Sequence, residues 1–123
     1  MNDVLIIGGG NAGLTAAITA AENGCKVLLL EASGKEDRGG NTKYTRNIRY
    51  AHENPDKYTD GTYSKEEFLK DLSSVSDGAV DRNMAELVIE QSKTMPKWME
   101  KHGIIFKKTI KGTINLSRTN AFF

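Results

Sequence analysis

The sequence has 123 residues, which is the length of about one domain and allows a hydrophobic core of modest size. Its 17 basic and 16 acidic residues give a net charge of +1, which argues against a polyanionic partner such as nucleic acid. The single cysteine, Cys25, excludes an internal disulfide. We expect it to be a small buried side chain in a reducing compartment, which fits a cytoplasmic protein.

The apolar N-terminal stretch from Val4 to Ala21 fits neither a signal peptide nor a membrane span. It lacks a basic segment before it, and glycines interrupt its centre. We therefore expect a cytoplasmic location and no direct insertion into a membrane.

The first 31 residues predict a strand, a helix and a second strand. Asp3 to Ile7 is a short apolar run that ends at glycine, and Lys26 to Glu31 is a second such run. Between them, residues 11–23 hold the small and apolar side chains of a helix, with Gly24 as its C-terminal cap. Both strands are expected to be buried, the second on both faces, and to be parallel and joined by a right-handed crossover.

The residues from Ala32 to Tyr63 show no sustained period and predict a long loop. A helix then begins at Ser64, where Ser64 and Glu67 have the spacing of a capping box. A loop of that length in a compact domain is typically functional or disordered.

The remaining chain predicts one longer helix and a hairpin. The helix is expected over residues 81–102, with Pro96 as a possible kink and Gly103 as its end. Two short strands are expected in the tail, with a turn near Lys111 and Gly112. The apolar stripe of the helix is made by Met84, Leu87, Val88, Met95, Trp98 and Met99.

Three glycines between the first strand and the first helix form the spacing of a dinucleotide-binding turn. Gly8 would allow the tight turn, Gly10 the close approach of a diphosphate, and Gly13 the packing of helix against strand. The start of the helix offers unpaired N–H groups to the phosphates. Glu31 ends the second strand where a carboxylate would accept hydrogen bonds from the adenosine ribose.

The choice of dinucleotide depends on Glu31 and on the segment that follows it. The negative charge of Glu31 disfavours the 2′-phosphate of NADP, which leaves NAD and FAD. Residues 38–42 read Arg-Gly-Gly-Asn-Thr, in which two glycines allow close approach to a flat ring while Asn41 and Thr42 supply short polar side chains. This pattern favours a flavin, and a plain surface turn is the alternative.

The segments GGGNAGLTAAITAAENG, LLLEAS and RGGNTKYTRNIRYAH resemble the N-terminal part of the fumarate reductase and succinate dehydrogenase flavoproteins. The runs RGGNTKYTRN, WMEKHGIIF and LSRTNAFF are most similar to FAD-dependent tricarballylate dehydrogenases. The resemblance implies FAD as the cofactor, with Glu31 at the ribose and Asn41 and Thr42 on the flavin side. The candidate cofactor-binding residues are Gly8, Gly10, Asn11, Ala12, Gly13, Glu31, Ala32, Gly39, Gly40, Asn41 and Thr42.

The same resemblance implies an α/β fold class and a two-part organisation. Residues 1–62 would form a Rossmann-like βαβ FAD-binding unit with the flavin-side loop. Residues 63–123 would begin an α+β cap or substrate region. Relatives of this kind are several times longer and carry their catalytic acid, usually an arginine, in later parts, so we expect a truncated chain and assign no catalytic residue.

The resemblance further implies hydride transfer to FAD from a small polycarboxylate such as tricarballylate, with electrons passed to a partner protein at the membrane. The alternatives are a catalytically incompetent truncated dinucleotide-binding module and an NAD-binding module. No spacing of metal ligands appears in the sequence.

Several further residues have two interpretations from sequence. Arg46 and Arg49 are candidates to grip a tricarboxylate or the FAD diphosphate, or are solvated loop residues. His52 is expected at the surface, and His102 at a helix C-terminus as a partner of the dipole. Further expectations are that the face with Trp98 and Phe106 is exposed and that a polar cluster reaches the substrate, made by Ser117, Arg118, Thr119 and Asn120.

Overall fold

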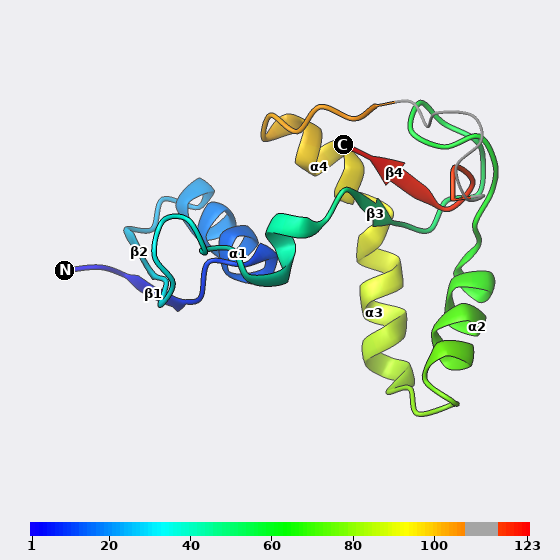
Figure 1. Ribbon diagram of the computed structural model, residues 1–123, viewed down its shortest axis with the longest axis horizontal. Helices are drawn as coiled ribbons and strands as arrows, with labels where there is room; N and C mark the ends of the chain where they lie inside the picture. The colour runs from blue at the N-terminus through cyan, green and yellow to red at the C-terminus, as the bar shows by residue number, and fades with distance from the viewer. Residues whose placement is uncertain (108–115) are drawn as a thin grey trace. The chain divides into compact units, whose positions relative to one another are not determined.

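The computed structural model describes residues 1–107 and 116–123, and it divides into two compact units, Met1–Thr45 and Arg46–Phe123. Figure 1 shows the elements of each unit in chain order. The division falls earlier than the expected boundary at residue 62, because residues 46–62 pack with the second unit. The expected turn near Lys111 and Gly112 lies outside the described residues.

The N-terminal unit is the expected strand, helix and strand. Strand β1 (Val4–Ile7) pairs in parallel with β2 (Val27–Leu30), and α1 (Asn11–Glu22) connects them. The helix ends as expected, since Gly24 adopts a φ of +83° directly after it. The sequence prediction of a parallel βαβ unit is therefore confirmed in its elements and pairing.

The two strands of this unit are covered on one face only. Ile6 lies on the face toward α1, where its Cγ2 would be 3.4 Å from a Cβ on Gly13. The expectation that both faces are buried is wrong, because α1 is the one layer that packs on this sheet in the unit, and a parallel sheet needs a layer on each face. The alternate positions remain exposed, at 60% for Leu5, 75% for Ile7, 41% for Leu28 and 47% for Leu30.

The predicted long loop contains regular structure. A 3₁₀ helix, η1, spans Gly40–Tyr44, and β3 (Asn47–Arg49) follows it. Strand β3 pairs antiparallel with β4 (Asn120–Phe122), as Figure 1 shows in the second unit. The strand pair could not be predicted from local sequence because its two strands are short and more than 70 residues apart.

The first helix of the second unit confirms the capping prediction. Helix α2 (Lys65–Val75) begins after Ser64, whose side chain accepts a hydrogen bond from the Glu67 N–H at 3.2 Å. The Glu67 side chain in turn accepts one from the Ser64 N–H at 3.2 Å. Two N–H groups of the first turn are thereby satisfied.

The predicted single helix over residues 81–102 is wrong in one respect, since it is two helices. Helix α3 (Arg82–Ser92) begins after the side-chain cap Asp81, and α4 (Met95–Lys101) follows after a break. Pro96 lies in the first turn of α4, where a missing N–H costs nothing, and its ring disfavours continuation of the preceding helix. Gly103, with a φ of +89°, follows the end of α4 as expected.

The buried side of α3 differs from the predicted apolar stripe. The buried residues of α3 are Ala85, Ile89 and Ser92, and Ile89 is completely buried. The three residues expected to face the core are largely exposed: Met84 at 57%, Leu87 at 56% and Val88 at 53%. The helix is apolar on more than one side, so periodicity alone did not decide which side packs on α2.

The core of the second unit consists of two aromatic clusters. One joins Ala51, Tyr63, Phe68 and Ile89 between the strands and helices α2 and α3, and Leu69 and Leu72 pack against it. The other contains Tyr50, Tyr58 and Ala121, with Ile48 and Phe106 beside it. The clusters account for the completely buried side chains of Tyr63 and Ile89.

The face with Trp98 and Phe106 is less exposed than expected. The Phe106 ring packs edge-on against Tyr58 at 4.9 Å and Phe123 at 6.0 Å. The Trp98 ring lies 4.1 Å from the ring of His102, and both tryptophan and phenylalanine are half-buried. The prediction of an exposed aromatic face is therefore wrong. Across residues 1–107 and 116–123, every helix is too short or too polar to cross a membrane.

Candidate dinucleotide site

The turn between β1 and α1 requires glycine at two of its positions for reasons internal to the chain. Gly8 has a φ of +99°, in the left-handed region that a side chain disfavours. At Gly13, a Cβ would overlap the carbonyl oxygen of Gly8 and touch Ile6. Gly8 therefore permits the turn, and Gly13 permits the close packing of α1 on β1, as the sequence predicts.

Gly10 has no such internal requirement. Its φ of −78° is open to any residue, and a Cβ would meet Thr42 Oγ1 at 3.6 Å and the Gly39 carbonyl oxygen at 3.7 Å, which is ordinary van der Waals contact. Gly10 is the N-cap of α1, and the close approach of a diphosphate to it stays a prediction. The turn thus fits a dinucleotide whose phosphates contact the main chain at the start of α1.

Glu31 lies against the glycine turn. Its Oε2 accepts a hydrogen bond from the Gly9 N–H at 2.6 Å, and its Oε1 accepts one from the Ser33 N–H at 2.9 Å. These N–H groups, Ser33 foremost and then Gly9, lower the pKa of the Glu31 carboxyl, so it is ionised at neutral pH. Because each carboxylate oxygen has a second lone pair, both remain able to accept hydrogen bonds from ribose hydroxyls.

The segment of residues 39–42 lies at the same turn. The Asn11 N–H, the first of α1, donates a hydrogen bond to Thr42 Oγ1 at 3.0 Å. Gly39 and Gly40 have φ values of +101° and +53°, so the backbone conformation itself accounts for the glycine pair. The structure brings the two predicted motifs together within Met1–Thr45. The contact of Asn41 and Thr42 with a flavin ring stays a prediction.

The other candidate residues lie around this turn with open surfaces. Asn11, Ala12, Ala32, Gly40 and Asn41 are exposed, and no residue of Met1–Thr45 is fully buried. The side that a ligand would contact is thus accessible. In the part of the chain that the structure describes, no group of three or more metal-ligating side chains occurs.

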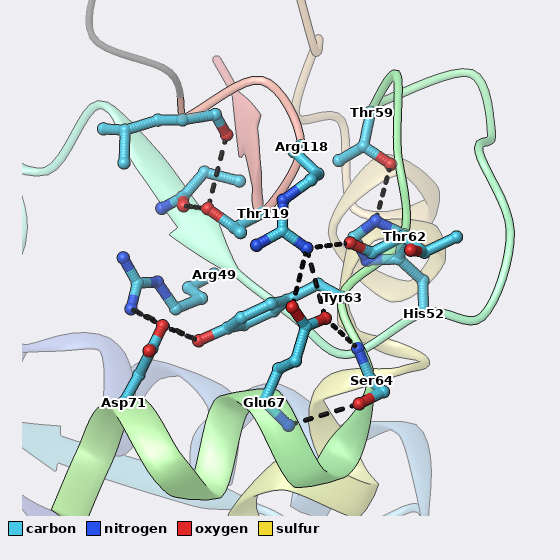
Figure 2. A network of polar contacts seen from close by, with 12 residues as sticks. Arg49, His52, Thr59, Thr62, Tyr63, Ser64, Glu67, Asp71, Arg118 and Thr119 are labelled. Atoms are coloured by element: carbon cyan, nitrogen blue, oxygen red, sulfur yellow. Dashed lines mark hydrogen bonds and ion pairs between the residues drawn. The ribbon is translucent and has the colours of Figure 1, made fainter. Parts of the chain in front are cut away.

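The second unit contains a network of polar contacts around Tyr63, which Figure 2 shows. The Tyr63 hydroxyl donates to Asp71 Oδ2 at 2.7 Å, and Arg49 Nη1 lies 3.5 Å from the same oxygen. Burial, with the Asp71 carboxylate second, raises the pKa of Tyr63. Tyr63 therefore stays protonated and holds its ring in place between β3 and α2.

Arg118, which lies just before β4, also belongs to this network. Its Nη1 donates to both carboxylate oxygens of Glu67, at 3.1 and 3.2 Å, and to the Thr62 carbonyl oxygen. The Arg118 guanidinium is the main reason that the pKa of Glu67 is lowered, with the Ser64 N–H second. The network thus joins Arg118, just before β4, to the start of α2.

The rest of the expected polar cluster at residues 117–120 is mostly buried. The Asn120 Nδ2 donates to Asn47 Oδ1 at 2.8 Å, across the β3–β4 pair. The Thr119 hydroxyl donates to Asn120 Oδ1 at 2.6 Å. These two side chains are occupied in holding the strand pair, so within this unit they are structural.

His52 is buried, at 9% exposure, and the expectation of a surface histidine is wrong. Its Nδ1 lies 3.0 Å from the Tyr50 carbonyl oxygen, and its Nε2 lies 3.0 Å from Thr59 Oγ1. Because a carbonyl oxygen only accepts, Nδ1 is the donor in the contact with Tyr50. The Tyr50 ring also stacks on the imidazole at 4.6 Å.

Sequence reasoning missed the residues that hold His52, and one local signal was present. Asp56 Oδ1 accepts hydrogen bonds from the N–H groups of Tyr58 at 2.8 Å and Thr59 at 3.1 Å, the pattern of an Asx turn. An aspartate that begins a turn is recognisable in a sequence. Its further bond to the Tyr50 hydroxyl at 2.9 Å depends on tertiary packing. His102, by contrast, caps α4 as expected, with Nδ1 2.7 Å from the Trp98 carbonyl oxygen.

Comparison with known proteins shows the family to which this chain belongs. The family described as "FAD binding domain" matches residues 3–122. The fumarate reductase (cytochrome) of Shewanella frigidimarina is 32% identical over 103 residues, which are 82% of this chain and 18% of that protein. The vinyl phenol reductase of Lactiplantibacillus plantarum is 27% identical over 105 residues, 85% of this chain and 21% of that protein.

A solved structure is also similar to this chain. The crystal structure of 3-ketosteroid-delta4-(5alpha)-dehydrogenase from Rhodococcus jostii RHA1, in complex with 4-androstene-3,17-dione, matches with a TM-score of 0.72 and 28% identity. The match covers 86% of this chain and 22% of that one. The chain thus spans about a fifth of the length of the relatives it matches.

The chain belongs to the FAD binding domain family, in the superfamily of fumarate reductase and succinate dehydrogenase flavoproteins. Its cofactor is FAD, as the sequence predicts. It is an FAD-binding domain of the flavin oxidoreductases, a class that includes both reductases and dehydrogenases.

Proposed function

We propose that this chain supplies the FAD-binding part of a dehydrogenase that oxidises a small polycarboxylate such as tricarballylate by hydride transfer to FAD. The observation that carries the FAD assignment is the convergence of Gly10, Glu31 and Thr42 at the start of α1. The polycarboxylate rests on the resemblance of RGGNTKYTRN, WMEKHGIIF and LSRTNAFF to tricarballylate dehydrogenases, and the fumarate reductase among the relatives is named for a dicarboxylate.

Each part of the turn has a distinct task in this proposal. The N–H groups that follow Asn11 in the first turn of α1 and the positive end of its dipole bind the diphosphate, while the Asn11 N–H is held by Thr42. The Glu31 carboxylate, held by the N–H groups of Gly9 and Ser33, accepts hydrogen bonds from the ribose. FAD, when bound, supplies the hydride acceptor, and the protein supplies binding, orientation and electrostatics. The reduced cofactor passes electrons to a partner protein, and the protein is cytoplasmic.

The test is a titration of the whole 123-residue chain with FAD, followed by turnover. We expect quenching of flavin fluorescence on binding and a rise in melting temperature with FAD but not with NAD. Reduction of a dye by the flavin-loaded protein is then measured with tricarballylate, succinate and 4-androstene-3,17-dione. Dye reduction with tricarballylate alone supports the polycarboxylate substrate, and reduction with the steroid alone contradicts it.

The alternative function is a dinucleotide-binding module without turnover. It predicts bound flavin and no dye reduction with any of the three compounds. Stabilisation by NAD with no gain from FAD would instead indicate an NAD-binding module and contradict the proposal at its first step.

A further inference from the structure

Two arginines from distant parts of the chain are gathered at one aromatic ring of the second unit. The guanidinium carbons of Arg49 and Arg118 each lie 5.6 Å from the centroid of the Tyr63 ring. The two carbons are therefore separated by at most twice that distance. Figure 2 shows both side chains reaching Tyr63 from the side of the strands, while Glu67 and Asp71 reach it from α2.

The position of each arginine is fixed by packing as well as by charge. Arg49 also lies over the Phe68 ring, at 6.0 Å. The stem of Arg118 occupies space that a side chain at Gly61 would fill, since a Cβ there would overlap Arg118 Cγ. Tyr63 itself is completely buried, so the ring beneath the two arginines does not move freely. Stacked guanidinium groups of this kind are pre-organised for hydrogen bonding.

Neither arginine uses its full set of donors. Within residues 1–107 and 116–123, the hydrogen bonds of both guanidinium groups run through Nη1 alone. A guanidinium has five N–H donors, so the edge made by Nε and Nη2 remains available on each arginine. That edge matches the two oxygens of a carboxylate.

Of the two arginines, Arg49 has the longer ion pair with its protein partner. Its ion pair with Asp71 is 3.5 Å long, well beyond the usual length of about 2.7–2.9 Å for a charge-assisted hydrogen bond. The Arg49 side chain is 37% exposed and that of Arg118 is 40% exposed, so solvent reaches both. Glu67 and Asp71 balance the two positive charges, which keeps the pair of arginines stable without an anion.

We propose that Arg49 and Arg118, stacked on Tyr63, form a two-point clamp for two carboxylates of one small polycarboxylate. The inference rests on the proposed function for the identity of the anion, and it assigns the recognition of that anion to residues of this chain. Each carboxylate binds the Nε and Nη2 edge of one guanidinium. Residues 49 and 118 thereby become specificity-determining, and a monocarboxylate, which engages one arginine, binds weakly.

The test measures binding of tricarballylate, succinate and propionate to the whole chain by isothermal titration calorimetry. We expect saturable binding of tricarballylate and succinate, with propionate at least tenfold weaker. Arg49→Gln and Arg118→Gln each weaken tricarballylate binding at least tenfold. The matched control is Arg82→Gln, which removes an exposed arginine of α3 paired with Glu86 and leaves the affinity unchanged. Absence of saturable tricarballylate binding, propionate binding of equal strength, or full affinity in both glutamine variants overturns the clamp.

Two further variants separate binding from folding. Arg49→Lys and Arg118→Lys retain the charge and the stem but lose the fork, so we expect a native melting temperature with intermediate affinity. Folded lysine variants with wild-type affinity would also overturn the clamp. FAD titration of the same proteins keeps the two proposals apart: loss of the clamp with normal FAD binding leaves the cofactor site standing, and polycarboxylate binding without FAD binding refutes the proposed function alone.

Discussion

The two units of the chain are stabilised in different ways. The N-terminal unit, Met1–Thr45, has no fully buried residue and exposes the apolar side chains on one face of its two strands. The C-terminal unit, Arg46–Phe123, has two aromatic clusters and a set of buried polar side chains. Steric restrictions on glycine and hydrogen bonds to main-chain N–H groups define the first unit, whereas side-chain packing defines the second.

This difference shows that glycine positions determine the structure of the first unit and large buried side chains determine that of the second. A site built from the main chain depends on the absence of side chains, as at Gly8, Gly10 and Gly13, and it can be precise with little core. A unit built on packing depends on a few large side chains, such as Tyr63 and Ile89. Substitutions in the second unit are therefore expected to change stability, whereas substitutions at the glycine turn are expected to change FAD affinity, with or without a change in stability.

The largest expected effect is at the centre of the second unit. Ile89→Ala leaves a cavity at a completely buried position and should lower the free energy of unfolding by about 2–5 kcal/mol. Leu87→Ala, on the exposed side of the same helix, should change it by less than about 0.5 kcal/mol. Urea denaturation followed by circular dichroism measures both. Equal losses in the two variants would contradict the exposure of Leu87 and would mean that both sides of the helix are buried.

The next effect is at the glycine turn. Gly13→Ala forces α1 away from β1, at a cost of about 1–3 kcal/mol, because the new Cβ overlaps the Gly8 carbonyl oxygen. We expect lower stability and at least tenfold weaker FAD binding, measured by thermal melting and flavin fluorescence.

Gly10→Ala is the matched variant for the same turn. Its Cβ meets no atom closer than 3.6 Å, so the melting temperature without ligand should not change, while FAD affinity should fall. An unchanged FAD affinity in Gly10→Ala would contradict the close approach of the diphosphate at this residue.

A smaller effect is expected at the start of α2. Ser64→Ala removes the acceptor of the capping box and should destabilise the second unit by about 1 kcal/mol. Ser74→Ala, at an exposed position inside the same helix, should be neutral or slightly stabilising because alanine has the higher helix propensity. Thermal denaturation of the two variants tests the difference, and a loss at Ser74 as large as at Ser64 would argue against the cap.

The smallest expected effect is the pH dependence of the turn. Because the pKa of Glu31 is lowered in the folded state, its stabilising contribution is present above the ordinary pKa of glutamate and is lost as the pH falls through the lowered value. The amide signal of Gly9, which donates to Glu31, should titrate in NMR spectra with a midpoint below that ordinary value. Glu31→Gln should abolish this titration, and a midpoint at or above the ordinary value would contradict the hydrogen bonds of Ser33 and Gly9.

Much of the fold could be predicted from local sequence. The βαβ unit, the capping box at Ser64 and the end of α4 at Gly103 are confirmed, because each depends on residues close together in the chain. The break before α4 was anticipated only as a kink at Pro96. The strand pair β3–β4 and the burial of His52 could not be predicted, because they depend on partners that are not identifiable from local sequence.

Some features of the candidate site could likewise be predicted from local sequence, and others could not. The backbone roles of Gly8 and Gly13, and the place of Glu31 beside the glycine turn, could be predicted because a strand, a turn and a helix fix them within 31 residues. The binding of a ribose by Glu31 stays a prediction. That Thr42 accepts a hydrogen bond from the first N–H of α1 was not predicted, although both residues were candidates.

The sequence by itself determined the kind of turn this protein contains: the order of strand, glycine turn, helix and terminal glutamate is that of a dinucleotide-binding turn, and short-range sterics suffice to form it. Only the tertiary structure decided which distant side chains meet, and so placed Arg49 and Arg118 on the one ring of Tyr63. The physical reason is that backbone conformation follows from neighbouring residues, whereas side-chain packing is selected by the whole set of contacts that the folded unit makes.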